Sequence, residues 1–287
     1  MALNFTPEIW SKLALANLNK LLVADNITNQ DYDGDFNQAG DTVHAFLAGD
    51  VTITNYVKNT DHATPQTMSN TDDIIYITQQ KMYNYFLDRV DIKQIPLNLL
   101  NLFDGRAHYA MRDVMDLFIL GYYVYVANAN KVTMHHRLSP SNIYTYCAEL
   151  QRRLTVSKVP LSPRFLVIDA YILEVINQYL AGKNTSLGDQ ATVDGYVGKF
   201  CGFDIYLSSN VPIVNEAVSS VAGKKDVHKC LAGHKMGITF PRQIPPDAVN
   251  IAYVPERRFG TAVKSLCVYG AKMLYNGQAN GLLNAWL

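Results

Sequence analysis

A chain of 287 residues with 48% hydrophobic and 17% charged residues can bury a sizeable core and is too apolar to be intrinsically disordered. Lysine plus arginine and aspartate plus glutamate both number 25, so the formal net charge is zero. This excludes a strongly basic protein that grips nucleic acid by neutralising phosphates, because such affinity grows with the number of cationic contacts.

The first predicted element is a helix from Thr6 to about Ala24. Thr6 can cap it, and Phe5 with Trp10 has the spacing of a hydrophobic staple. Its apolar stripe must pack on another surface, yet the segment 25–41 that follows is polar and rich in turn formers. The pattern leaves open whether this helix packs on its own domain or on a neighbouring molecule.

A long hairpin is predicted next, because the hydrophobic period changes to two at Asp41. Four segments are expected to be strands: Thr42–Phe46, Val51–Tyr56, Ile74–Ile77 and Tyr83–Val90. The polar tract 58–71 separates the second from the third and should form the tip. A two-stranded ribbon is marginal alone, so we expect it to need a third strand or a partner surface.

The longest helical pattern runs from Pro96 to Tyr123. Pro96 suits the first helical turn, and Gly121 is a plausible stop. Residues 117–127 are apolar on every face but too few to cross a bilayer, which needs about 20. They predict a helix end that runs into a buried strand. The apolar residues at helical spacing, expected to form one buried stripe, are Leu99, Leu100, Phe103, Ala107, Ala110, Met111, Val114, Met115 and Phe118.

The second half of the chain predicts an α/β region. Ser139-Pro140 opens a helix, and a short buried strand precedes a second helix. Near the end, two strands joined by a turn near Gly260 precede a short apolar tail. In order, these elements are a helix over 141–154, a strand over 164–170, a helix over 171–180, two strands within 251–274 and the tail 282–287.

Three glycines, Gly195, Gly198 and Gly202, precede an alternating apolar segment. A phosphate-binding loop needs a strand, then glycines, then a helix, whereas here a strand follows the glycines. The segment therefore predicts a tight turn into a strand.

Candidate catalytic and metal-binding residues are few. His228, Cys230 and His234 are ligand-type residues, but a structural zinc site needs four ligands, so we predict no metal. The alternating carboxylates between Asp31 and Asp35 lack the glycine and glutamate register of a calcium loop and predict a solvated acidic loop. Motifs of hydrolases, zinc proteases and nucleotide-binding loops are absent, so we predict no catalytic residue and no cofactor.

Two features concern the cellular compartment. The first ten residues contain no basic stretch followed by an apolar run, so we expect no secretory signal and synthesis in the cytosol. Four cysteines lie far apart, and we expect reduced thiols packed in the core: Cys147, Cys201, Cys230 and Cys267.

Taken in order, these elements resemble the major capsid proteins of tailed bacteriophages, which have the HK97 fold, an α+β fold. The resemblance covers nearly the whole chain. Its most specific parts are Gly195–Pro212, Leu231–Thr239 and Val254–Lys264 leading to Tyr269–Lys272. Pro7–Trp10 and Gln38–Thr42 are similar to the branch related to the P22 coat protein.

The resemblance implies five regions. They are an N-terminal arm (1–40), an extended β-hairpin or E-loop (41–90), a peripheral (P) domain with a long spine helix (91–138), an axial (A) domain with an α/β pattern (139–246), and the return strands of the P domain with a C-terminal tail (247–287).

The implied function is structural: self-assembly as pentamers and hexamers into the icosahedral capsid that encloses viral double-stranded DNA in the virion, after synthesis in a bacterial host. The implied partners are copies of the chain itself, a scaffolding protein, a portal protein and, where the virus has one, a decoration protein. DNA is expected to be enclosed without sequence-specific binding, and no membrane is involved. A separate scaffolding protein is implied because the chain begins at the arm without a long helical leader.

Two other functions stay open at this point. One is the shell of an encapsulin-like cellular compartment, which resembles the same fold and encloses cargo enzymes. The other is a soluble α/β enzyme with an unrecognised site. The sequence also leaves covalent cross-linking open, because an isopeptide bond needs a lysine, an asparagine and a carboxylate, which we expect to come from different subunits.

Overall fold

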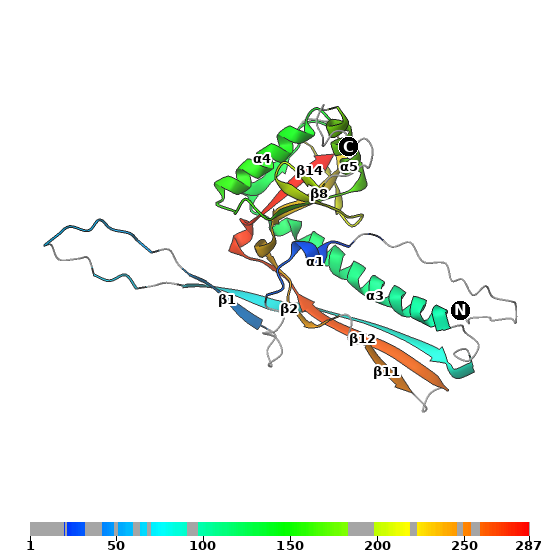
Figure 1. Ribbon diagram of the computed structural model, residues 1–287. Coiled ribbons are helices and arrows are strands. Elements are labelled where there is room, and N and C mark those ends of the chain that lie inside the picture. The colour runs from blue at the N-terminus through cyan, green and yellow to red at the C-terminus, as the bar shows by residue number, and fades with distance from the viewer. Residues whose placement is uncertain are drawn as a thin grey trace.

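The computed structural model describes residues 20, 22–31, 42–48, 51–59, 64–67, 70–90, 97–182, 198–218, 223–245, 249–253 and 259–286, and the statements below concern these residues. Figure 1 shows a rounded lobe of helices and strands above an elongated part, in which one long helix lies along a sheet. A loop projects sideways from one end of that sheet (Figure 1). None of the described helices is both long enough and apolar enough to span a membrane.

The sheet of the elongated part is antiparallel. β2 lies at its centre and pairs with β1 along its first part and with β12 along its second. β10 and β11 both pair with β12. The five strands are β1 (Thr42–Ala48), β2 (Asn70–Asp88), β10 (Arg242–Ile244), β11 (Val249–Tyr253) and β12 (Gly260–Gly270).

β2 is one continuous strand, although the sequence predicted two separate ones. The predicted hairpin is confirmed at its base, where Thr42 pairs with Tyr76 and Ala48 with Asn70. The strand expected over Val51–Tyr56 is wrong, because this segment pairs with no described strand and stays exposed. Alternation alone does not make a strand when no backbone partner is in reach.

The long helix is α3 (Leu97–Leu120), close to its predicted bounds. Among the side chains of α3 that the structure describes, the buried ones all belong to the second half, where Met111, Met115 and Ile119 face the rest of the chain. The side chains of Leu99 and Leu100 lie outside the described residues. Three residues that were expected in the buried stripe are exposed: Phe103, Ala110 and Val114. Only the last turns of α3 reach the rounded lobe (Figure 1), so the lobe does not cover the first half of the helix.

The buried strand expected after α3 is wrong. The chain forms the 3-10 helix η2 (Gly121–Tyr125), in which Val124 and Tyr125 are exposed. A tight helical turn continues the direction of α3 and brings the chain to the edge of the rounded lobe.

The rounded lobe contains a seven-stranded mixed sheet in the order β3-β14-β8-β4-β6-β5, with β7 also paired to β8. Its strands are β3 (Lys131–Thr133), β4 (Arg164–Ile168), β5 (Lys199–Phe200), β6 (Phe203–Leu207), β7 (Ile213–Ala217), β8 (Lys224–His234) and β14 (Asn280–Trp286). Two helices pack on it, α4 (Ile143–Val156) and α5 (Ala170–Ala181), and both agree with the predicted helices.

β14 corrects the expectation of an apolar tail at the end of the chain. All its residues are buried, and the strand lies between β3, in parallel, and β8, in antiparallel orientation. A strand covered on both faces lacks the alternation that identifies a half-buried strand, so its short apolar run looks like a tail in the sequence.

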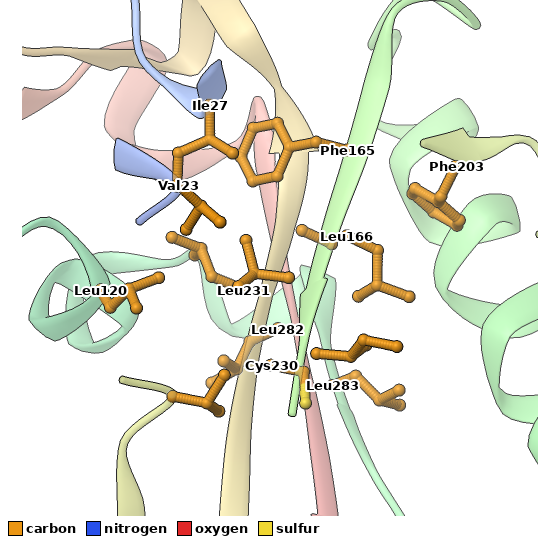
Figure 2. Packing of buried hydrophobic residues seen from close by; sticks show 14 of the residues in the cluster. Val23, Ile27, Leu120, Phe165, Leu166, Phe203, Cys230, Leu231, Leu282 and Leu283 are labelled. Carbon is orange, nitrogen blue, oxygen red and sulfur yellow. The ribbon is translucent and has the colours of Figure 1, made fainter. Parts of the chain in front are cut away.

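The main hydrophobic core surrounds β14, β8 and β4. Leu231 and Leu282 point to the side where the short helix α1 (Ala24–Ile27) lies, and Cys230 and Leu283 point to the other side (Figure 2). Each fully buried side chain of this size contributes about 1.5–3 kcal/mol. The remaining short elements are η3 (Asn128–Asn130), η4 (Lys235–Gly237), β9 (Ile238–Thr239), β13 (Lys272–Met273) and η5 (Tyr275–Gly277).

The glycine-rich segment forms the predicted tight turn. β5 and β6 are antiparallel neighbours joined by Cys201 and Gly202, whose φ angles are +48° and +77°. Two positive φ values are typical of the turn that matches the twist of a hairpin. Gly195 lies outside the described residues.

Candidate functional site

The projecting loop is the most exposed apolar part of the described chain. Residues 51–59 and 64–67 are all exposed. Val51 is 59% exposed, Ile53 93% and Tyr56 74%. Several exposed apolar side chains on one short segment are typical of a surface that another molecule covers.

The base of the hairpin is covered by the chain itself. Ile75 is fully buried and packs with Ala45 of β1 and Leu274. An ion pair also stabilises the base of the hairpin, since Lys272 Nζ lies 2.8 Å from Asp73 Oδ1. The expectation that the hairpin needs a third strand is confirmed, because β12 pairs with the second part of β2. The described loop residues beyond β1 and β2 stay exposed.

A groove of about 470 Å³ lies beside this base. The hydroxyl of Tyr122 donates to the carbonyl of Ala271 at 2.7 Å. Burial, with a smaller effect of nearby Tyr125, raises the pKa of Tyr122 to about 12, so the phenol stays a neutral donor. The groove is lined by Ile74, Tyr76, Thr78, Tyr122, Tyr125, Ala271, Lys272, Met273, Asn276 and Gly277.

A buried carboxylate holds the start of α1. Asp116 of α3 is fully buried, and its Oδ1 accepts hydrogen bonds from the backbone N–H groups of Val23 and Ala24, both at 2.8 Å. Its Oδ2 accepts from Ser208 Oγ at 3.3 Å and from Asn210 Nδ2 at 3.0 Å. A negative charge at a helix N-terminus satisfies N–H groups that have no partner within the helix.

A second group of polar residues surrounds this contact. Lys20 Nζ donates to Asn210 Oδ1 at 3.0 Å and lies 3.5 Å from Asp113 Oδ2. Asn210 Nδ2 also donates to Asp113 Oδ1 at 2.6 Å, and the backbone N–H of Lys20 donates to the hydroxyl of Tyr109. The described end of the N-terminal segment, residues 20 and 22–31, is thus bound to α3 and to the loop after β6 of its own chain. The helix predicted over Thr6–Ala24 lies outside the described residues except near its end.

The three ligand-type residues of β8 have separate surroundings. His228 Nδ1 pairs with the carboxylate of Asp169, and His234 Nδ1 accepts from the backbone of Met236 at 3.3 Å. Burial lowers the pKa of His234 and raises that of the Cys230 thiol. In the part of the chain that the structure describes, no three His, Cys, Asp or Glu side chains form a group suited to a metal ion. Of the acidic loop, only the exposed Asp31 is described.

All four cysteines are free. Cys147, Cys230 and Cys267 are buried, and Cys201 is half-buried. Burial raises the pKa of the Cys147 thiol and raises that of Cys201 to about 11, so both stay protonated at neutral pH. Protonated thiols are weak nucleophiles.

A cavity of about 750 Å³ lies on the rounded lobe beside His228. Ser139 also lines it, so the Asp169–His228 pair and a serine hydroxyl share one region. The Ser139 hydroxyl, however, is hydrogen-bonded to that of Ser141 at 3.0 Å. A nucleophile needs a base within hydrogen-bond reach, and the described geometry here does not form that pair.

Comparison with known proteins gives a result only at the level of structure. No family model and no curated protein matches the chain. A solved chain from Mycobacterium phage Che8 is 21% identical, with a TM-score of 0.75, and the match covers 99% of this chain and 98% of that one. The capsid structure of cyanophage P-SCSP1u gives 14% identity and a TM-score of 0.75, over 97% of this chain and 92% of that one. The capsid of Ralstonia phage GP4 gives 12% identity and a TM-score of 0.67, over 100% and 98%.

These matches extend over almost the full length of both chains, so they include the long helix, the hairpin and the rounded lobe together. The identities are too low to separate one branch of capsid proteins from another. The predicted α+β class is confirmed, and the chain has the HK97-like fold of phage capsid chains.

Proposed function

We propose that this protein is a major capsid protein that self-assembles as pentamers and hexamers into the icosahedral shell of a virion. The observation that carries the proposal is the structural match to phage capsid chains over nearly the whole length. Fold alone does not imply function. The exposed apolar loop adds independent support, because a single chain leaves it uncovered while copies of the chain would cover it.

The division into regions follows the same proposal. Residues 1–40 form the arm, 41–90 the E-loop, 91–138 the P domain with α3 as its spine helix, 139–246 the A domain, and 247–287 the return strands followed by β14. The long sheet under α3 supports the P-domain assignment. The pairing of β14 with β8 on one side and with β3 on the other adds residues 280–286 and 131–133 to the A-domain sheet.

The hairpin works between subunits in this proposal, with its loop lying over the P domain of a neighbour. Val51, Ile53 and Val57 supply the apolar contact. Covering each such side chain fully contributes about 1.5–3 kcal/mol before the ordering cost of the loop is subtracted. A closed shell repeats this modest contact in every subunit.

The other proposed partners are a scaffolding protein, a portal protein and, in a virus that has one, a decoration protein. The zero net charge supports enclosure of double-stranded DNA without sequence-specific binding, since a container that neutralised each phosphate would hold its DNA tightly. Pro7–Trp10 and Gln38–Thr42 support the branch related to the P22 coat protein.

The test is assembly. The protein is expressed with a scaffolding protein from its own genome and examined by sedimentation and negative-stain microscopy. Closed shells with pentamers and hexamers are expected, and compact monomers alone would contradict the proposal. The contents of particles recovered from cells then separate a virus, which encloses DNA, from an encapsulin-like compartment, which encloses an enzyme.

A further inference from the structure

A lysine, an asparagine and a glutamate meet in the sheet of the rounded lobe. Lys229 of β8 and Asn284 of β14 are directly opposite each other in the antiparallel register. Lys229 Nζ donates a hydrogen bond to Asn284 Oδ1 at 3.1 Å. Glu216 of β7 contacts the same Nζ through its Oε1. An amine, a carboxamide and a carboxylate are thus in direct contact, although they come from three strands.

The surroundings of this contact are apolar. Successive side chains of a strand alternate between its faces, so the residues two positions away lie on the same face as Lys229 and Asn284. These neighbours form two cross-strand pairs, Val227 with Trp286 and Leu231 with Leu282, and all four side chains are buried. They exclude water from the lysine on both sides along the strands.

The three side chains differ in their exposure to solvent, and Glu216 is the most exposed of them. The side chain of Lys229 is 6% exposed, whereas that of Glu216 is 39% exposed. Asn284 is also buried, and its Nδ2 donates to Thr133 Oγ1 of β3 at 3.1 Å. This second bond fixes the amide plane with its oxygen toward the lysine amine. Nζ is therefore held within hydrogen-bond distance of the carboxamide group, and such positioning replaces a chance encounter by a reaction within one site.

We infer that Lys229 and Asn284 form an isopeptide bond within a single chain, with Glu216 as the proton-transfer group. The Lys229 ammonium gives one proton to Glu216, and the free amine attacks Asn284 Cγ. The Nζ–Cγ bond forms, and one further proton passes from Nζ to Nδ2. The Cγ–Nδ2 bond then breaks, ammonia leaves, and Glu216 returns its proton to give ammonium.

The step is balanced without a further reactant. An ammonium group and a carboxamide become a secondary amide and a free ammonium ion, so the total charge is unchanged and nothing is oxidised or reduced. Glu216 ends as the carboxylate with which it began. Its exposed side gives the ammonium ion a route to solvent.

The bond has a structural consequence. β14 is the last strand of the described chain, and the link joins it covalently to β8. The C-terminal strand can then no longer separate from the sheet, whatever force acts on the chain. The inference concerns chemistry within one chain, so it stands or falls independently of the proposed shell.

The experiment is mass spectrometry on the full-length protein purified in its folded state. The intact mass, measured in denaturant, is expected to be lower than the sequence mass by one molecule of ammonia. Trypsin does not cleave after an acylated lysine, so digestion should yield peptide 226–235 linked to peptide 273–287. A full sequence mass together with unlinked 273–287 would overturn the inference.

One other reaction causes the same loss of mass, and a variant of Lys229 distinguishes it from the isopeptide bond. Asn276-Gly277 and Asn280-Gly281 can each lose ammonia to form a cyclic imide within peptide 273–287. Lys229→Arg keeps the positive charge but removes the attacking amine, so it should restore the full mass. Retention of the mass loss in Lys229→Arg would show an imide and contradict the isopeptide bond.

Two more variants complete the design. Glu216→Gln should leave most of the protein unlinked, because the carboxylate no longer accepts a proton; rapid linking in this variant would contradict the role of Glu216. Lys225→Arg is the matched control on the same strand and should link as fully as the unaltered protein. The peptide map of the unaltered protein decides the main point even where a variant folds poorly.

Discussion

The rounded lobe and the projecting hairpin differ in whether their apolar side chains are buried. In the lobe, every residue of β4 and β14 is buried, and helices cover the sheet. In the hairpin, Ile75 is the only buried residue among the described side chains of β2, and the loop beyond it exposes Val51 and Ile53. The lobe is thus complete within one chain, whereas the hairpin is stable only at its base and offers its far end to a partner.

The largest effect is expected when residues 51–67 are replaced by a short Gly-Ser turn, because this change removes the exposed loop and leaves the base of the hairpin intact. The β1–β2 pairs lie outside the replaced segment, so the melting temperature of the monomer should hardly change. Assembly should be lost, because the apolar contact disappears from every subunit. Calorimetry and sedimentation measure the two effects separately. Normal shells would refute the role of the loop, and a chain that fails to fold would place the loop in the core.

Leu231→Ala tests the completeness of the lobe. The side chain is fully buried in the main core, so its removal should lower the free energy of unfolding by about 2–5 kcal/mol. Leu117→Ala is the matched control on the exposed side of α3 and should change it by no more than about 0.5 kcal/mol. Denaturant titrations measure both values. Similar losses in the two variants would mean that the far face of α3 is also covered.

Asp116→Ala tests the contact between α1, α3 and the lobe. Four hydrogen-bond donors lose a charged acceptor, so we expect a loss of about 1.5–3 kcal/mol. Asp204→Ala, which breaks a surface pair with Lys199, is the control and should cost at most about 1 kcal/mol. Faster hydrogen exchange at Val23 and Ala24 in Asp116→Ala should accompany the loss. Unchanged exchange there would show that α1 is held by other contacts.

Cys230→Ser tests whether β8 has a structural or a metal-binding role. We expect a loss of about 1–3 kcal/mol, which is the cost of burying a hydroxyl in an apolar place. Elemental analysis of the unaltered protein should find no zinc. One zinc ion per chain would contradict the structural interpretation of His228, Cys230 and His234.

The smallest expected effect is a pH dependence at His234. Burial lowers the pKa of this side chain below its usual value of 6.5, so the folded state binds fewer protons than the unfolded state between the two values. The contribution of His234 to stability is therefore present above 6.5 and declines as the pH falls through this window. His234→Gln should flatten that part of the profile in denaturant titrations. If the slope of stability against pH is unchanged in this variant, other groups cause that part of the pH dependence.

Several elements could be predicted from the sequence because their signals are local. The helical period identified α3, α4 and α5 to within a few residues. The order of glycines and strand correctly predicted the turn at Gly202, whose positive φ favours glycine. The ordered segments also indicated the capsid fold, since a family resemblance depends on residue order and not on contacts.

Other features were decided only by the tertiary structure, because they depend on residues far apart in the chain. β14 is a central strand only since β3 and β8 lie on its two sides, and no periodicity marks a strand buried on both faces. In the sequence, Asp116 is one polar residue of α3 among others. Its hydrogen-bond donors, the backbone N–H groups of Val23 and Ala24, lie 93 and 92 residues earlier in the chain, so only the folded structure shows this contact. Lys229 and Asn284 are 55 residues apart and meet through strand register. Local pattern fixes which backbone form a segment prefers, but contacts between distant segments decide which polar groups share a buried site.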